Sequence, residues 1–133
     1  MLDHARNKKL RSKFTEGIIT EIPFRNNSFD CVVCLGVLQN FDGKIEKAIE
    51  EIFRIVKEDG DVFITTIDRS YEGYVKGEME KKDFFVYYEP KLLCTEFEKI
   101  GFKIENCQSF STETSEILPL HKWNKFFIHA VKK

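Results

Sequence analysis

Hydrophobic positions in the middle of the chain follow a strand pattern, then a helix pattern, then a strand pattern again. Residues Phe29 to Leu35 are almost continuously apolar, which is typical of a parallel strand covered on both faces. Asp61 to Ile67 is rich in β-branched residues and predicts the next strand. Between these strands, apolar residues recur at helical spacing at Ile45, Ala48, Ile49, Ile52, Phe53 and Val56. The pattern predicts a βαβ unit with a right-handed crossover.

Polar residues, proline and glycine mark the ends of the predicted helices. Asp42 is the expected N-cap of the middle helix, and Gly60 lies beyond its end. A second helix is predicted to begin at Pro90, which suits a first helical position, and to end before Gly101.

The rest of the chain adds one helix, three strands and a long connection. Residues from Met1 to about Leu10 predict the tail of a helix, and Phe14 to Ile22 a short strand. Phe102 to Phe110 and Trp123 to Val131 predict two more strands. The stretch from Asp68 to Glu89 carries mixed charge and six aromatic residues, and its pattern specifies no regular element.

Composition places these elements in one domain without a global charge. The chain has 133 residues, of which 42% are hydrophobic, so one core is expected. The formal net charge of −1 supplies no general attraction for nucleic acid or an acidic membrane surface. The longest apolar stretch, Cys31 to Leu38, is too short to cross a bilayer. We therefore expect a cytoplasmic protein with no nucleic-acid or membrane partner.

Cysteine and histidine positions argue against a metal or redox motif. Cys31 and Cys34 have the spacing of a metal or redox motif, but residues i and i+3 of a strand point to opposite faces. The pair is interpreted as two small apolar strand residues, and all four cysteines are expected to be reduced. The three histidines share no metal-binding spacing, so no metal site is predicted.

The run from Ile22 to Phe41, IPFRNNSFDCVVCLGVLQNF, combines a polar turn with the buried strand. It resembles the signature of class I S-adenosylmethionine-dependent methyltransferases, of the methyltransferase type 11 kind. The turn from Lys57 to Gly60 stands where that family usually has Lys-Pro-Gly-Gly. The resemblance implies an α/β fold with a three-layer, Rossmann-like methyltransferase sheet, mostly parallel with an antiparallel last strand. Residues 1–133 are expected to form a single domain, equivalent to the C-terminal two-thirds of the family fold.

The N-terminal residues resemble an internal part of that family. The segment from Met1 to Lys8 is similar to the helix that follows the family's second strand. No glycine-rich loop between a strand and a helix precedes the signature. The resemblance therefore implies an N-terminally truncated fold that lacks the first two strands and half of the methyl-donor site.

The remaining half of the donor site is assigned by the resemblance to five positions. Ile18 stands where an aspartate often accepts a hydrogen bond from the adenine of S-adenosylmethionine, a bond that isoleucine cannot make. Ile19 is placed against the adenine ring, although a core strand explains both isoleucines equally well. Cys34, Leu35 and Gly36 are placed where backbone atoms meet the methionine end of the donor. Gly36 either permits close approach of the ligand or relaxes the strand end.

Two further groups of residues have both a functional and a structural interpretation. Gln39 stands where the family often has a polar residue facing the cofactor, but it also suits a solvated position before Asp42. Tyr71, Tyr74, Phe85 and Tyr88 lie in the family's variable lid, which shapes the acceptor pocket, and they suit a hydrophobic core equally.

The family's sheet order, 3-2-1-4-5-7-6, predicts an exposed edge at Phe29–Leu35. An apolar edge strand is a template for pairing with another chain. We expect a homo-oligomer, a partner chain at this edge, or coverage by the N-terminal segment. Three hypotheses follow: part of a methyltransferase acting on an unidentified acceptor such as a small molecule, a non-catalytic methyltransferase-like protein acting through oligomerisation or a partner chain, and an unrelated α/β domain.

Overall fold

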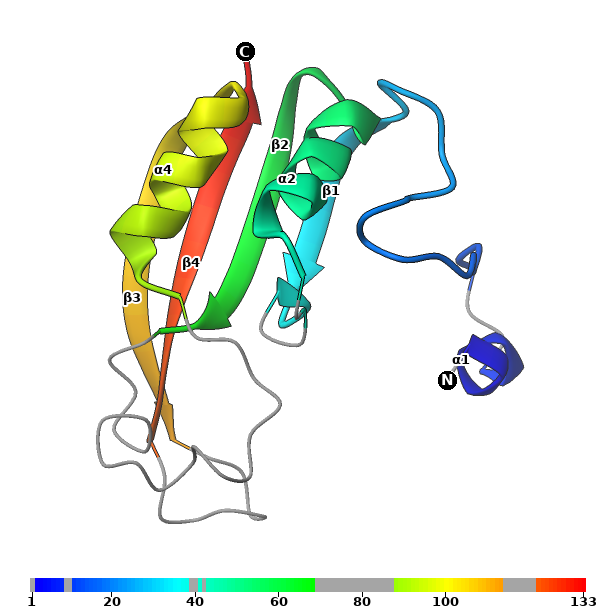
Figure 1. The fold of residues 1–133 in the computed structure, drawn as a ribbon. Helices are drawn as coiled ribbons and strands as arrows, with labels where there is room; N and C mark the ends of the chain where they lie inside the picture. The colour runs from blue at the N-terminus through cyan, green and yellow to red at the C-terminus, as the bar shows by residue number, and fades with distance from the viewer. Residues whose placement is uncertain (1, 9–10, 39–40, 42, 69–87, 114–121) are drawn as a thin grey trace.

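The computed structural model describes residues 2–8, 11–38, 41, 43–68, 88–113 and 122–133. Four strands form one sheet in the order β1-β2-β4-β3 (Figure 1). The strands are β1 (Phe29–Leu35), β2 (Val56–Ile67), β3 (Phe102–Glu113) and β4 (Lys122–Lys132). The helices are α1 (Leu2–Asn7), α2 (Ile45–Ile55) and α4 (Pro90–Ile100).

The connections confirm the predicted α/β topology. Strand β1 pairs in parallel with β2, and α2 forms the crossover between them. Strand β4 pairs antiparallel with both β2 and β3, so only the last strand opposes the direction of the others. The predicted antiparallel last strand is confirmed, and β1 lies at the edge of the sheet that the described residues form.

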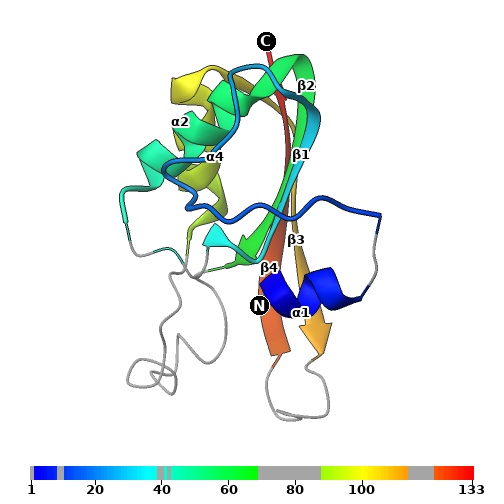
Figure 2. The same ribbon diagram turned by 90° about the vertical axis from the view of Figure 1, so that its right-hand side faces the viewer.

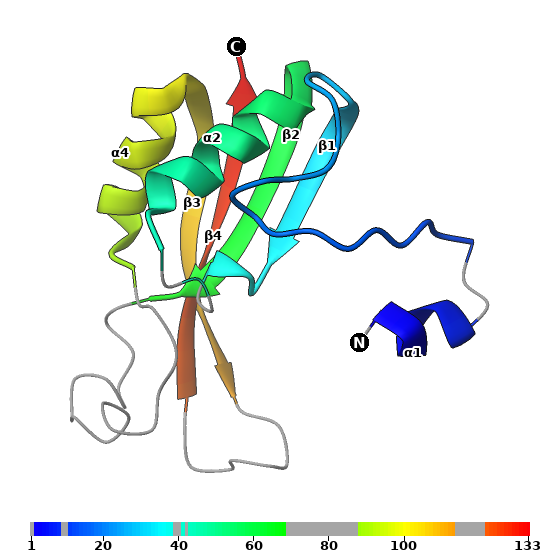
Figure 3. The ribbon, with the colours of Figure 1, turned by 45° about the vertical axis from the view of Figure 1, so that its right-hand side comes forward.

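The core lies between the sheet and the two longer helices, which cover the same face (Figures 1 and 3). Alternate residues of the central strands point toward these helices and are fully buried, among them Ile64 and Ile128. Ile52 of α2 and Phe97 of α4 belong to the same buried core and pack from the helix layer. The helical spacing seen in the sequence therefore corresponds to the buried faces of α2 and α4.

The opposite face of the sheet carries no helix of the described part of the chain (Figure 2). Helix α1 lies beyond the β1 edge rather than on the sheet (Figures 1 and 3). On this face Phe63 stacks on Phe127 and on His129, with ring centroids 5.8 and 4.5 Å apart. Val33 and Leu35 of β1 are 58% and 59% exposed. An apolar strip therefore remains in contact with solvent along the edge.

Loop residues before β1 bind the C-terminal end of α2. The backbone N–H of Asn27 donates to the carbonyl of Arg54 at 2.8 Å, and that of Ser28 donates to Ile55 at 2.7 Å. Asn27 adopts a φ of 53°, a conformation that asparagine tolerates better than most residues. These bonds satisfy helix-terminal carbonyls that have no partner within a helix.

Two sequence predictions, one strand and one helix cap, differ from the structure. Phe14–Ile22 is not a strand: the segment contains only an isolated bridge between Ile18 and Glu21. A strand needs a neighbour for its backbone groups, and in the described residues β1 pairs only with β2. The N-cap of α2 is Lys44, without a side-chain capping bond, whereas Asp42 lies outside the described residues.

The predicted turn at Lys57–Gly60 forms a bulge inside a longer strand. Phe29 pairs with Val56 and Cys31 with Asp61, so β2 contains the extra residues. Within the bulge, a Cβ atom at Gly60 would lie 2.9 Å from the carbonyl oxygen of Asp30 and 2.8 Å from that of Lys57. Only glycine fits this close approach of the backbone.

Candidate functional site

A groove of about 460 Å³ lies between the segment before β1 and β1 itself. Isoleucine, valine, proline and phenylalanine side chains form most of its wall, and Ile52 of α2 contributes from the helix layer. Such a surface suits a flat, largely apolar group better than a charged one. The groove is lined by Thr15, Gly17, Ile18, Ile19, Ile22, Pro23, Phe24, Val32, Val33, Cys34, Val37 and Ile52.

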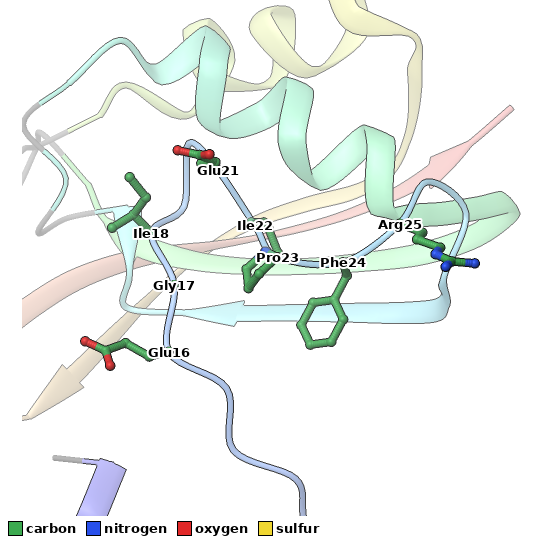
Figure 4. A pocket seen from close by; sticks show the side chains of 8 residues that line it. All are labelled: Glu16, Gly17, Ile18, Glu21, Ile22, Pro23, Phe24 and Arg25. Carbon is green, nitrogen blue, oxygen red and sulfur yellow. The ribbon is translucent and has the colours of Figure 1, made fainter.

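The same segment borders a second hollow, of about 510 Å³, which opens to solvent (Figure 4). Glu16, Glu21 and Arg25 add charged groups to its rim. In Figure 4 the segment runs between α2 and β1. It therefore contributes to an apolar groove and to a more polar hollow.

Arg54 of α2 holds this segment in place. Its guanidinium donates to the carbonyls of Ile22 and Phe24 at 2.8 and 2.6 Å, and to Asn26 Oδ1 at 3.1 Å. It also binds both carboxylate oxygens of Glu51, at 2.7 and 2.8 Å. Glu51 accepts a further bond from the backbone N–H of Ile22 at 2.7 Å. This arrangement is called the Arg54 clamp below.

The clamp is charged over the neutral pH range. The hydrogen bond from Arg54 lowers the pKa of the Glu51 carboxyl, against a smaller opposing effect of desolvation. The same bond raises the pKa of Arg54. Because the lowered pKa keeps the Glu51 carboxylate ionised to a lower pH than an ordinary glutamate, the Glu51–Arg54 ion pair is present at neutral pH and is lost only in acid.

Three of the predicted donor-site residues meet in the groove. Ile18, Ile19 and Cys34 all line it. Ile18 is 62% exposed, whereas Ile19 packs against the hydrophobic core and Cys34 is buried. Side chains separated by many residues in the sequence thus share one surface, as the interpretation of these positions requires.

Leu35 and Gly36 lie at the carboxyl end of β1 but do not line the groove. The side chain of Leu35 belongs to the exposed strip on the other face of the sheet. Gly36 adopts a φ of 67° and donates its N–H to the carbonyl of Thr65 at 3.0 Å. This left-handed conformation favours glycine at the strand end, so the local backbone accounts for the residue.

Of the predicted lid, the structure describes only Tyr88. Its hydroxyl donates to the carbonyl of Leu38 at 3.3 Å, just beyond β1, and its N–H donates to Ile67 at the end of β2. Tyr88 is partly buried against the core and connects the carboxyl ends of the two parallel strands. Gln39, Tyr71, Tyr74 and Phe85 lie outside the described residues.

Sequence reasoning did not single out Asp68, which directly follows β2. Its side chain is 7% exposed, and Ser109 Oγ donates to its carboxylate at 3.4 Å. The available signal was an acidic residue after a parallel strand, because ligands of open α/β sheets bind at the carboxyl ends of strands. Asp68 adds a buried carboxylate to the same end of the sheet as Tyr88.

Cys31 and Cys34 point to opposite faces of β1, as predicted from their spacing. Cys31 is exposed, Cys34 is buried, and both are free thiols. Burial raises the pKa of the Cys34 thiol to about 11. Cys34 is therefore protonated at neutral pH and is a poor nucleophile.

Alkylation is expected to distinguish the two thiols. Iodoacetamide at about pH 8 should modify Cys31 and leave Cys34 largely unmodified until the chain is unfolded, because the reacting species is the thiolate. Mass spectrometry of the tryptic peptide 26–44, which contains both cysteines, would measure the order of labelling. Equal labelling rates in the folded protein would contradict the assigned burial of Cys34.

The structure shows two absences within its described residues. They contain no group of three or more histidine, cysteine, aspartate or glutamate side chains placed to hold a metal ion. None of their helices has the length and apolar character needed to span a membrane.

Comparison with known proteins shows a methyltransferase domain match in the first part of the chain and a shared fold over all of it. Residues 1–64 match the methyltransferase domain family. The fold matches a Thermotoga maritima S-adenosylmethionine-dependent methyltransferase, described as a possible histamine N-methyltransferase, with a TM-score of 0.77 and 20% identity over all of this chain and 69% of that one. Residues 1–64 therefore match the methyltransferase domain family, and the chain as a whole has the fold of S-adenosylmethionine-dependent methyltransferases.

Two other similar proteins extend the comparison. An uncharacterised Methanocaldococcus jannaschii protein is 33% identical over 96 residues, which make up 72% of this chain and 40% of the relative. The chain thus spans well under half of that relative's length. The Haloferax volcanii complex between the Trm112 methyltransferase activator and a methyltransferase matches with a TM-score of 0.75 and 17% identity, over 98% of this chain and 67% of that one.

Proposed function

We propose that this chain forms part of an S-adenosylmethionine-dependent methyltransferase and holds the adenine end of the methyl donor in the groove beside β1. The observation that carries the proposal is the convergence of Ile18, Ile19 and Cys34 on one apolar surface. The isoleucines would pack against the faces of the adenine ring. Backbone groups of Leu35 and Gly36, at the carboxyl end of β1, would meet the methionine part of the donor.

Methyl transfer from a sulfonium depends mainly on alignment of donor and acceptor. The chain's contribution is therefore positional: the Arg54 clamp fixes the groove wall, and Tyr88 fixes the loop after β1 through Leu38. Protonation of Cys34 keeps a thiol in the groove wall from competing for the methyl group.

We assign acceptor binding to the lid with Tyr71, Tyr74, Phe85 and Tyr88, and a polar donor contact to Gln39. The acceptor is unidentified, and a small molecule is one of the classes of acceptor that this scaffold accommodates.

Restoring the family's acidic residue tests the groove as the adenine site. Ile18→Asp should tighten binding of S-adenosylhomocysteine about five- to tenfold, because a carboxylate here would accept a hydrogen bond from the adenine amino group. Equilibrium dialysis with labelled ligand measures the change. Leu92→Asp is the matched control, since Leu92 is similarly exposed but lies on α4. Equal or weaker binding by Ile18→Asp would contradict the assignment.

We further propose that β1 pairs along its free edge with a second copy or a partner chain. Within the described residues β1 is bonded on one side only, and Val33 and Leu35 expose apolar side chains beside its edge. The complex of the Haloferax volcanii protein with Trm112 shows that a structurally similar methyltransferase binds a protein partner.

A lysine on β1 should weaken this association. Val33→Lys is expected to lower the self-association constant at least about tenfold, because a charged side chain opposes burial of the strip. Sedimentation equilibrium would measure it, with Leu92→Lys as the control for loss of an exposed apolar residue elsewhere. A wild-type chain that stays monomeric at high concentration would exclude pairing with a second copy and leave a partner chain as the occupant.

A further inference from the structure

The open face of the sheet is apolar in the middle and carries opposite charges at its two ends. Phe63 of β2 and Phe127 of β4 occupy the middle, where their partly buried rings stack 5.8 Å apart. Asp61 lies at one end, and its side chain is 47% exposed. Lys125 lies at the other end, because it pairs with Ile67, six residues further along β2. Side chains alternate between the faces of a strand, so these residues share the open face.

Strand β1 extends the apolar middle of this face toward the free edge. Val33 pairs with Phe63 and Leu35 with Thr65 in parallel register, so both side chains lie on the open face. They are 58% and 59% exposed, and Figure 2 shows no helix of the described residues over them. Parallel strands are normally covered on both faces, and a large exposed apolar patch is typical of an interaction surface.

We propose that the open face packs against the same face of a second copy of this chain, as two sheets pack in a sandwich. The two-fold axis lies across the strands, level with Ile64 and Ile128, which pair midway between the two charged ends. Rotation about this axis reverses the strand direction. Asp61 of one copy therefore faces Lys125 of the other, and the phenylalanine rings meet in the centre. The face is complementary to itself in charge, which favours a second copy as its occupant.

The charged groups at the two ends cannot meet within one copy. Six residues of strand place Asp61 and Lys125 about 20 Å apart. Within one copy the Asp61 carboxylate contacts His129 Nε2 at 2.7 Å, and the ammonium of the other copy would approach it from the exposed side. This packing uses side chains of the central strands. It is therefore separate from backbone pairing along the β1 edge and from the donor groove, whose walls include neither Asp61 nor Lys125.

Zero-length cross-linking of the wild-type chain tests this interface. A water-soluble carbodiimide joins a carboxylate to an amine that it contacts, and the covalent dimer is then isolated and digested with trypsin. The expected product joins Asp61, in peptide 58–69, to Lys125, in peptide 123–132, which stays uncut at the modified lysine. Fragment ions must place the link at Asp61, because Asp68 of the same peptide follows Ile67, the neighbour of Lys125 within one copy. A covalent dimer linked only at other sites, or a chain that stays monomeric at high concentration, would overturn the proposal.

Charge reversal separates this interface from pairing along the β1 edge. Asp61→Lys and Lys125→Asp should each lower the dimer association constant at least about tenfold, because each places like charges opposite one another twice in the symmetric dimer. The double variant should recover most of the loss, whereas Lys91→Asp, at an exposed position of α4, should have little effect. Sedimentation equilibrium measures all four, and a folded double variant without recovery would overturn the proposal. Binding of S-adenosylhomocysteine reports on the groove independently, and the wild-type cross-link decides the question even if a variant fails to fold.

Discussion

Lys132→Ala is expected to lower the free energy of unfolding by about 2–4 kcal/mol, a large loss for a residue one position from the end of the chain. The Lys132 side chain is 5% exposed. Its ammonium donates to Asn27 Oδ1 at 2.9 Å and to the carbonyls of Phe53 and Val56 at 2.8 and 3.0 Å. It also lies 4.4 Å from the centre of the Phe53 ring.

The loss follows from the groups that would remain. Phe53 and Val56 lie at the C-terminal end of α2, where backbone carbonyls have no partner within the helix. A cation there is also favoured by the helix dipole. Without Lys132 these buried carbonyls would lose their hydrogen bonds while staying shielded from water, and the link between β4 and the loop at Asn27 would be lost.

Urea denaturation of wild type and variant measures the difference. Lys57→Ala is the matched control, because Lys57 is half-exposed and makes one surface ion pair, with Asp30 at 3.3 Å. That variant should change the free energy of unfolding by no more than about 0.5 kcal/mol. Equal effects of the two substitutions would show that burial of Lys132 carries no special stabilisation.

The second large effect is expected from Arg54→Ala, which should weaken binding of S-adenosylhomocysteine about tenfold or more. The variant removes every side-chain donor that holds the carbonyls of Ile22 and Phe24. It also leaves Glu51 without its guanidinium partner. Because the freed segment supplies one wall of the groove, ligand binding would then have to include the cost of ordering that wall.

Hydrogen exchange would show whether the segment is released. The backbone N–H of Ile22, bonded to Glu51, should exchange faster in the Arg54 variant, while amides in the centre of β2 should keep their protection. Arg25→Ala is the control, since Arg25 belongs to the same segment but its side chain lies at the exposed rim of the second hollow. Unchanged exchange at Ile22 together with unchanged affinity would contradict the role assigned to the clamp.

The sequence was sufficient to predict the helices and strands whose hydrophobic periodicity reflects a buried face. The apolar positions of α2 from Ile45 to Phe53 and the proline at the start of α4 lie where the pattern placed them, and the apolar run Phe29–Leu35 forms β1. Two details were wrong: Val56, predicted as helical, begins β2, and β1 is not covered on both faces, since Val33 and Leu35 are exposed. The segment Phe14–Ile22 was mispredicted because Ile19 packs against the core through its side chain, while the backbone of the segment forms only an isolated bridge between Ile18 and Glu21. Periodicity reports burial, and it cannot show whether backbone groups find a strand partner.

Only part of the candidate site could be predicted from the sequence, for a related reason. Ile18, Ile19 and Cys34 could be identified through a family pattern, but the Arg54 clamp could not, since it binds the backbone carbonyls of two residues about thirty positions away. Backbone acceptors leave no mark in a sequence.

Fold and family do not by themselves give the reaction of this chain, because one scaffold hosts many activities. Binding of the methyl donor in the groove can be measured without knowing the acceptor. The donor's adenine is the part that we propose the groove binds, and S-adenosylhomocysteine carries that adenine without a reactive methyl group.

Isothermal titration of the folded chain with S-adenosylhomocysteine, with its mass in solution measured on the same sample, shows whether the groove binds the methyl donor. We expect binding near the micromolar range, about −8 kcal/mol, that weakens with Arg54→Ala and strengthens with Ile18→Asp. A folded sample that shows no binding up to about millimolar ligand, about −4 kcal/mol, would contradict it. The chain would then be a methyltransferase-like scaffold whose groove does not hold the donor.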